Sequence, residues 1–242
     1  MTKGGLGEDL KRCRRLLVGV ALILSAGIAS GDENPRDPYE GFNRTMYSVN
    51  DALDTVALKP VAKAYDTVVP LSMKAGTGNF FGNAGDLWIG ANSALQGKLG
   101  DAGIDMARLL INSTVGIFGL FDVASELGLE KHEEDFGQTM AVWGVSDGPY
   151  FFWPFIGPRT LRDTAGWFAD SYVDPVWSAS RRSIAVRNSL VALRFVDIRA
   201  SLLPADKIVD EAALDKYAYI RDAYLQRRRN QIYDGRPPRL DD

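Results

Sequence analysis

Cysteine and histidine are almost missing from this 242-residue chain, which contains one residue of each. Zinc sites need three or four nitrogen, sulfur or oxygen ligands in a fixed geometry, so the composition argues against a zinc protein. The single cysteine, Cys13, allows no disulfide within the chain, and the fold must therefore rely on its core. The single histidine, His132, stands in the charged segment 130–135, where we expect it to be solvated.

Catalytic signatures are also absent. No G-x-S-x-G nucleophile elbow occurs, and a serine–histidine triad would have to use His132 without any serine that the sequence nominates. The glycines of 76–78 lack the G-K-[ST] ending of a phosphate-binding loop and are interpreted as a flexible helix flank. The acids at 133–135 could hold a hard cation weakly, but a solvated acidic surface is the preferred interpretation. The sequence therefore predicts a protein that is not an enzyme and has no metal or cofactor.

The chain has no excess of positive charge, because 28 lysines and arginines stand against 31 acids and the formal net charge is -3. Nucleic-acid binding needs a concentrated positive field, so we expect no nucleic-acid partner. Two arginine runs, at 181–182 and 227–229, could contact anionic headgroups or phosphates. For 227–229 a solvated helix face is the preferred interpretation, because that run closes an expected helix, where basic residues suit the dipole.

The first 30 residues have the pattern of an export signal. Basic residues precede an uncharged apolar run at 16–29, which ends in small residues and is shorter than the ~20 residues of a membrane span. We predict a signal peptide at 1–30, with an uncleaved anchor helix as the alternative. Residues 31–38 contain two prolines, each of which disfavours helix in the preceding residue, and should form a polar extended linker.

Sustained alternation of polar and apolar residues is nearly missing from the rest of the chain, whereas helical spacing recurs. Helices are expected at 39–56 and 59–69, and Pro70 is a good first-turn residue for the next helix. Further helices are expected at 86–95, 101–112, 160–172, 178–203 and 212–233. Gly235 and the prolines after it should end the last helix and leave a disordered tail at 235–242. Without an internal repeat or a domain boundary, the sequence predicts one all-α domain at 39–234, with at most one short hairpin.

Two apolar stretches do not suit a plain soluble helical bundle. Residues 111–128 mix glycines with bulky side chains, and Gly116 and Gly119 would let another backbone or an acyl chain approach closely. Residues 147–158 place aromatic side chains between Gly-Pro pairs, and their three prolines exclude a continuous helix. This second stretch could be a buried loop that fills the core or an aromatic collar at a bilayer interface, and the residues alone favour neither.

A series of ordered motifs resembles the MlaA family, also called VacJ. The opening D-P-Y-E-G-F-N-R-T-M-Y-S-V-N-D-A-L-D at 37–54 is followed by N-F-F-G-N at 79–83 and R-L-L-I-N-S-T-V-G at 108–116. Further blocks include G-P-Y at 148–150, P-F at 154–155 and L-R-D at 161–163, and the resemblance extends from 37 to 228. No single block identifies the family. The occurrence of all the blocks in the same order, over nearly the whole exported chain, makes the resemblance specific.

The resemblance nominates site residues of two kinds. The candidates for the N-terminal motif are Asp37, Pro38, Glu40, Phe42, Asn43 and Arg44. The candidates for the lipid path or the family motifs are Asn79, Phe80, Gly82, Asn83, Asn112, Gly116, Gly119, Gly144, Gly148, Pro149, Tyr150, Pro154, Arg162 and Asp163. We expect 79–83, 111–119 and 144–158 to lie together beside that path, with Gly116 and Gly119 leaving room in it.

The family resemblance implies a fold and a mechanism. It implies a ring-like helical body in the inner leaflet of the Gram-negative outer membrane, facing the periplasm and associated with a trimeric porin. Mislocalised phospholipids would leave the outer leaflet through an amphipathic channel and pass to a soluble periplasmic lipid-carrier protein. No bond is broken in such a process, which agrees with the missing catalytic signatures. The alternatives are a structural tether between porin and periplasmic partners, or an exported lipid hydrolase.

One position departs from the family. Its members are typically lipoproteins whose signal ends in L-x-x-C, whereas this chain reads L-S-A-G at 24–27. Glycine at 27 cannot be acylated, so the chain should hold the membrane by its apolar surface, by a partner or by an uncleaved N-terminus.

Overall fold

The computed structural model describes residues 34–179 and 183–239, and of residues 178 and 179 only the backbone. The expected signal peptide at 1–30, the arginines at 181–182 and residues 240–242 of the expected tail lie outside this description.

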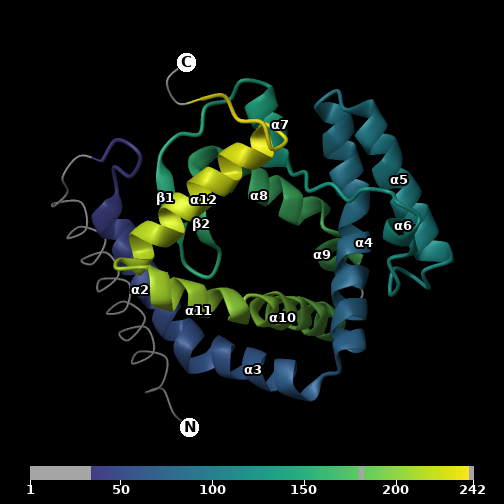
Figure 1. Ribbon diagram of the computed structural model, residues 1–242, viewed down its shortest axis with the longest axis horizontal. Helices are drawn as coiled ribbons and strands as arrows, with labels where there is room; N and C mark the ends of the chain where they lie inside the picture. Colours follow the sequence, from purple (N-terminus) through teal and green to yellow (C-terminus); the bar gives the residue numbers. More distant parts are fainter. Residues whose placement is uncertain (1–33, 180–182, 240–242) are drawn as a thin grey trace, which may run out of the picture.

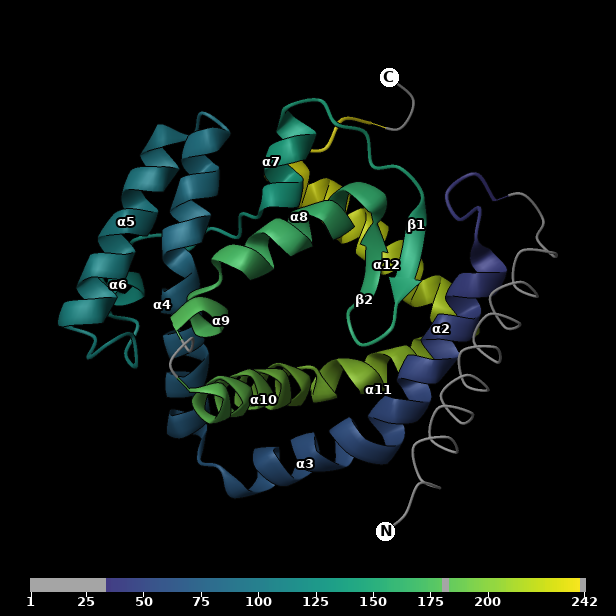
Figure 2. The ribbon, with the colours of Figure 1, turned by 180° about the vertical axis from the view of Figure 1, so that it is seen from behind.

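The expectation of a ring-like all-α domain is confirmed (Figure 1). The elements in chain order are α2 (Glu40–Leu53), the π-helix η1 (Asp54–Leu58), α3 (Lys59–Val68), α4 (Leu71–Leu95), α5 (Leu99–Thr114), α6 (Val123–Glu126), α7 (Phe136–Val142), β1 (Tyr150–Trp153), β2 (Gly157–Thr160), α8 (Leu161–Val173), α9 (Pro175–Ala179), α10 (Ile184–Ser201), α11 (Leu203–Ala212) and α12 (Lys216–Ile232). Figures 1 and 2 show α2 and α3 along one side of the ring and α4 along the next. Helices α7, α8 and α12 lie opposite α3, and α10 follows α3 on its inner side.

The first side of the ring is longer than the sequence pattern suggests. Helices were expected at 39–56 and 59–69, but η1 joins α2 to α3 without a break, and Pro60 is tolerated in the first turn of α3. Asp54, the first residue of η1, receives two hydrogen bonds from Arg199 of α10, at 2.7 and 2.8 Å. The same guanidinium bonds Asp206 of α11 at 2.7 Å. Arg199 thus fastens the inner helices to this side.

Helix α4 corrects two expectations. It begins at Leu71, directly after Pro70, and continues without a break to Leu95, so the glycines of 76–78 are helical and not a flexible flank. Asp86 is a buried mid-helix residue paired with Lys131 at 2.9 Å, not a helix start. Glycine is retained where α5 approaches closely: a Cβ on Gly90 would lie 2.7 Å from Met106 Cε and 3.2 Å from Asp105 Cβ. Close packing, which the local pattern does not reveal, compensates for the poor helix propensity of glycine.

The C-terminal helices are divided differently from the expectation. The single helix expected at 178–203 corresponds to the end of α9 and to α10, and α11 follows from Leu203. Helix α11 ends at Ala212, where the last helix was expected to begin, and that last helix, α12, begins at Lys216. Pro204 fits the first turn of α11, and Asp215 caps α12 by accepting a hydrogen bond from Ala218 N at 3.1 Å. Residues 235–239, expected to be disordered, form no helix or strand, but Pro238 O accepts a hydrogen bond from Arg229.

The stretch 147–158 contributes the short hairpin that the sequence allowed. Strands β1 and β2 are antiparallel, with Tyr150 opposite Thr160 and Trp153 opposite Gly157. Tyr150 and Phe152 are buried and form a core cluster with Tyr217 of α12, as in the buried-loop interpretation. Phe155 in the turn is 76% exposed, so the tip of the same hairpin presents an aromatic side chain outward.

The linker at 31–38 was expected to be extended, but its described residues, from 34 onward, are not extended throughout. Residues 34–37 form a turn, closed by a hydrogen bond from Asp37 N to Asn34 O at 2.9 Å. Asp37 is 1% exposed and accepts hydrogen bonds from Asn43, Tyr217 and Arg221. A buried carboxylate needs such donors, and these come partly from α12, about 180 residues away, which local sequence cannot indicate.

Candidate functional site

Side chains are distributed in an unusual way in this fold. Among the described residues, seventeen buried side chains are polar or charged and nine are apolar, whereas 37 large apolar side chains are exposed. The buried polar side chains are the informative part of this distribution, because single exposed apolar side chains are common on folded proteins. The polar side chains are gathered in junctions where elements meet, and those junctions contain most residues that the sequence nominated.

The first junction joins α4, α5 and the loop at 115–122. Arg108 is fully buried and donates two hydrogen bonds to Asp122, at 2.9 and 3.0 Å. Asn112 bonds Asp122 Oδ1 at 2.9 Å and accepts from Ala124 N, also at 2.9 Å. Burial alone would raise the pKa of Asp122, but hydrogen bonds from Ser125 and Asn112 and from the Arg108 guanidinium lower it to about 2.

The nominated residues of α4 lie against the same loop. Asn79 donates to Leu120 O at 3.3 Å, and Asn83 donates to Ser113 Oγ at 3.0 Å. A Cβ on Gly82 would lie 3.0 Å from Lys131 Nζ, and the Phe80 ring contacts Phe81 with centroids 5.4 Å apart. Segments 79–83 and 111–119 therefore come together, as expected.

The two glycines of this loop do not leave room. A Cβ on Gly116 would lie 2.2 Å from Phe121 O and 2.6 Å from Asn112 O. A Cβ on Gly119, whose φ is +84°, would lie 2.6 Å from Asn83 Cβ. The expectation of open space at these positions is wrong, because the chain's own backbone and Asn83 fill it.

The second junction attaches the N-terminal motif to the hairpin. Asn43 is fully buried and donates to Asp37 at 2.7 Å and to Tyr150 O at 3.1 Å. Its amide oxygen accepts from Phe152 N at 2.8 Å, so one side chain replaces a neighbouring strand along β1. Phe42 packs edge-on against Phe151, with centroids 6.5 Å apart, while Pro38 belongs to the turn before α2.

The third junction is centred on Asp163 at the start of α8. It binds the guanidinium groups of Arg162 and Arg228, each at 3.0 Å, and the hydroxyl of Tyr224 at 2.6 Å. Burial would raise the pKa of Asp163, but Arg228, Tyr224 and Arg162 lower it. Arg228 also bonds Asp135 at 2.6 and 2.7 Å.

The acidic and basic runs are thus not simply solvated surfaces. Arg228 is 7% exposed and belongs to the third junction, so the expected solvated face at 227–229 is wrong at its centre. Glu134 pairs with Lys98 at 2.9 Å, and Glu133 pairs with Arg227 at 3.0 Å. Both runs become ion-pair partners because α7 and α12 meet in three dimensions.

The remaining nominated residues shape the ends of the hairpin. Gly144 and Gly148 have positive φ, +89° and +66°, which favours glycine. Pro149 O accepts from Leu161 N at 2.9 Å, and Arg162 reaches back to Val145 O at 3.3 Å. Pro154 stands beside the turn that joins the strands. The stretch 144–158 bonds α2 and α8, and its Tyr150 and Phe152 pack with Tyr217 of α12. It lies across the ring from α4, so the three nominated stretches do not all meet (Figure 2).

His132 is paired rather than solvated. Its Nδ1 lies 2.8 Å from Asp105 Oδ1, and Ser93 Oγ donates to Asp105 Oδ2 at 3.1 Å. A serine hydrolase needs histidine between the serine and the acid. Here the acid lies between serine and histidine, so the arrangement is not a catalytic triad.

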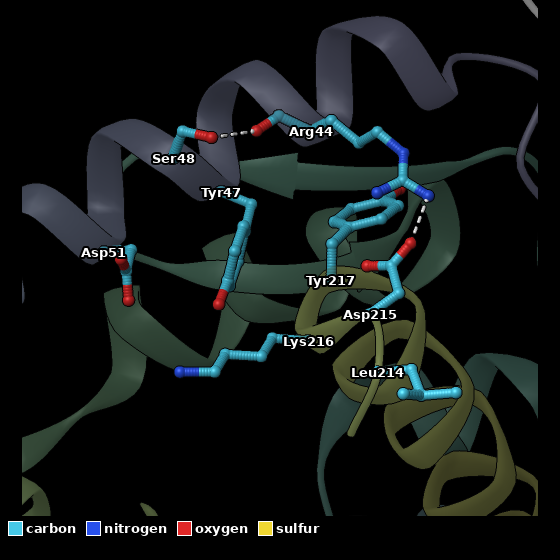
Figure 3. A pocket seen from close by; sticks show the side chains of 8 residues that line it. All are labelled: Arg44, Tyr47, Ser48, Asp51, Leu214, Asp215, Lys216 and Tyr217. Carbon is cyan, nitrogen blue, oxygen red and sulfur yellow. Dashed lines mark hydrogen bonds and ion pairs between the residues drawn. The ribbon is translucent and has the colours of Figure 1, made fainter. Parts of the chain in front are cut away.

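A shallow pocket between α2 and the start of α12 was missed by sequence reasoning (Figure 3). Its walls are formed by Arg44, Tyr47, Ser48, Asp51, Leu214, Asp215, Lys216 and Tyr217. Arg44 bonds Glu40 at 2.7 Å and Asp215 at 2.6 Å, and its guanidinium carbon lies 4.6 Å from the centre of the Tyr217 ring. Tyr47, Ser48 and Asp51 also lie in the motif at 37–54, but of the pocket residues only Arg44 was nominated as a site residue. The pocket requires two segments about 170 residues apart, which the sequence does not bring together.

Known proteins resemble this chain over most of its length. The family described as MlaA lipoprotein matches residues 35–231. The intermembrane phospholipid transport system lipoprotein MlaA of Escherichia coli K12 is 35% identical over 221 residues, which cover 89% of this chain and 86% of that protein. Its counterpart in Haemophilus influenzae is 29% identical, covering 83% and 80%.

A solved structure, from work on the structural basis for maintenance of bacterial outer membrane lipid asymmetry, has the same fold. It superposes with a TM-score of 0.70 at 33% sequence identity and covers 83% of this chain and 99% of its own. Together with the sequence matches, this shows that the chain belongs to the MlaA lipoprotein family.

Proposed function

We propose that the protein transports phospholipids between membranes and thereby maintains the lipid asymmetry of the outer membrane. The observation that carries this proposal is the distribution of side chains, with polar groups collected in buried junctions and many large apolar groups exposed. The names of its relatives, which describe an intermembrane phospholipid transport system, support the same function.

The physical task explains why such a distribution is useful. A phospholipid headgroup that crosses an apolar layer without polar contacts costs several kcal/mol. A ring that contacts acyl chains with its apolar surface and offers polar groups to the headgroup removes much of that cost. In our proposal, phospholipids leave the outer leaflet through an amphipathic channel in the ring and pass to a soluble periplasmic carrier.

The nominated residues act mainly by holding this ring in shape. Asn43, Asn83, Asn112 and Asp163 are buried and engaged in the three junctions. We propose that they fix α4, α8 and the hairpin beside the lipid path rather than touch the lipid.

Attachment to the membrane also follows from the exposed apolar side chains. No helix within 34–179 or 183–239 is both long and apolar enough to cross a bilayer. We propose that the protein sits at the periplasmic face of the outer membrane, beside a trimeric porin, without an acyl chain at position 27. Metabolic labelling with an acyl probe should leave the protein unlabelled, and a labelled band would contradict this part of the proposal.

Native mass spectrometry of the protein, purified from membranes in mild detergent, tests the transport function. We expect intact phospholipids to leave the detergent micelle with the protein. Fatty acids or lysophospholipids that accumulate when the protein is incubated with phospholipid would instead indicate a hydrolase. A protein that never retains lipid, although folded and membrane-bound, would indicate a structural tether.

A further inference from the structure

Arg159 on β2 is partly buried and lacks the ion pair that four buried arginines of the ring possess. Arg108, Arg162, Arg221 and Arg228 each bind at least one carboxylate. Over the described part of the chain, no carboxylate oxygen lies within 4.0 Å of the guanidinium nitrogens of Arg159, and none of these side-chain nitrogens donates a hydrogen bond. The guanidinium group instead makes a cation–π contact with Trp167 of α8, whose ring centre lies 5.6 Å from the guanidinium carbon.

The side chain is enclosed at its stem and open at its end. Its Nε is buried without a hydrogen-bond partner, whereas Nη1 and Nη2 are not among the enclosed atoms. The two terminal nitrogens therefore reach accessible surface, while Nε is buried and the guanidinium carbon lies near the Trp167 ring. This leaves the forked end of the guanidinium, which can donate two parallel hydrogen bonds, available to a ligand.

The neighbouring acids are already engaged. Asp163 binds Arg162, Arg228 and Tyr224, and Asp135 binds Arg228 twice. Asp170 accepts from Trp88 Nε1 at 2.7 Å and from Phe136 N at 3.0 Å. Burial lowers the pKa of Arg159, although the charges of Asp135 and Asp163 act to raise it. Arg159 in turn acts to lower the pKa of Asp170. A partly buried cation without an ion pair is costly where neither water nor a ligand reaches it, so a ligand that reaches its open end would offset this cost.

We propose that Arg159 binds the phosphate of a phospholipid headgroup as the lipid passes the hairpin. This inference rests on the proposed transport function and names the chain's own contact to the substrate. A guanidinium matches phosphate oxygens in a bidentate geometry better than an ammonium group does. The same two elements expose Phe155 at the hairpin turn and Leu161 and Phe168 on α8, which supply apolar surface for the acyl chains.

Lipid binding by the full chain in nonionic detergent tests the assignment. The probes are phosphatidylglycerol and diacylglycerol that carry the same fluorophore. Arg159→Gln should weaken phosphatidylglycerol binding about tenfold, the lower end for a lost charged hydrogen bond, and leave diacylglycerol binding unchanged. Arg159→Lys, which keeps the charge but not the fork, should lose less. Arg227→Gln, which removes an exposed arginine paired with Glu133, should change neither affinity.

The outcomes separate this inference from the proposed function. Wild-type protein that binds neither lipid would overturn the transport function itself. Wild-type protein that binds phosphatidylglycerol, together with an Arg159→Gln variant that binds it equally well, would overturn only the role of Arg159. Millimolar inorganic phosphate should not displace the lipid, and displacement would show that the site takes free phosphate instead.

Folding of the variants is controlled separately. Since Arg159 has no ion pair to lose, we expect Arg159→Gln and Arg159→Met to unfold at or above the wild-type temperature. Arg159→Met retains the packing of the stem and reports binding if the glutamine variant does not fold. A methionine variant that binds phosphatidylglycerol as the wild type does would equally overturn the assignment.

Discussion

Single residues in this protein act through buried polar contacts more than through apolar packing. Asn43, Arg108 and Asp163 each connect at least two elements, and each is almost completely buried. Removal of one partner from such a contact exposes the other to the full cost of an unsatisfied buried group. The ring should therefore be sensitive to conservative changes at these positions.

Asn43 gives the first prediction at this scale. Asn43→Ala removes the donor to Tyr150 O and the acceptor for Phe152 N, and leaves Asp37 with one donor fewer. We expect the free energy of unfolding to fall by about 2–3 kcal/mol. Denaturant unfolding measures this, with the exposed Asn230→Ala as a control that should change stability by less than about 0.5 kcal/mol. Equal effects of the two substitutions would show that Asn43 does not clamp the hairpin.

Asp122 gives a prediction for pH. Its pKa is lowered to about 2 in the folded protein, so its contribution is complete above the unfolded pKa near 4 and is lost as pH falls toward 2. Its side chain is partly exposed, and screening reduces this contribution to about 1–2 kcal/mol. Unfolding free energies of wild type and Asp122→Asn should converge between pH 4 and pH 2. A difference that stays constant over that range would contradict the account.

Sequence reasoning found many of these residues but not their roles. The ordered family motifs nominated Asn43, Asn112 and Asp163, which the structure places in junctions. The same reasoning misjudged His132 and Arg228, because Asp105 and Asp135, their partners, lie 27 and 93 residues away. Arg159 carries no local signal at all, since its distinctive property is the lack of an ion pair in three dimensions.

Elements in this protein are defined by close approach as much as by helix propensity. Helical spacing located most of the helices, but it made 86–95, which is the end of α4, a separate helix and divided the C-terminal helices wrongly. Glycine lowers local propensity in α4, while contact with α5 compensates at Gly90. Such compensation depends on tertiary packing, which a single sequence does not display.

The loop after α5 provides the prediction at this scale. Alanine at Gly116 or Gly119 would meet backbone or Asn83 atoms at 2.2 to 2.6 Å, and at Gly119 it would also disfavour the positive φ. Each substitution should lower the free energy of unfolding by about 2 kcal/mol or more, and leucine at both should prevent folding.

Gly103, which lies within α5, serves as a matched control for the glycines of that loop. A Cβ on Gly103 would have no neighbour within 4 Å. Gly103→Ala should therefore be neutral or up to about 1 kcal/mol stabilising, because alanine is the better helix former. A stable, folded Gly116→Leu/Gly119→Leu protein would show that the two glycines border open space instead of packing.

The whole molecule combines buried polar junctions with many exposed apolar side chains. Exposed apolar side chains are found on α3, α4, α8 and α10 and at the hairpin turn, that is, around the ring and not on one patch. Fold class could be predicted from helical spacing, because that signal is local. Which polar side chains are buried and which apolar side chains are exposed could not be predicted, because burial depends on how the helices close into a ring (Figure 1).

The central claim is that this ring keeps phospholipids out of the outer leaflet of the outer membrane. Its most direct test measures outer-leaflet phospholipid in intact cells of the source bacterium, with an amine-reactive label that does not cross the membrane. Deletion of the gene should raise the labelled phosphatidylethanolamine, and the wild-type chain restored in trans should return it to the starting level. Labelling that is unchanged by the deletion would contradict a role in lipid asymmetry.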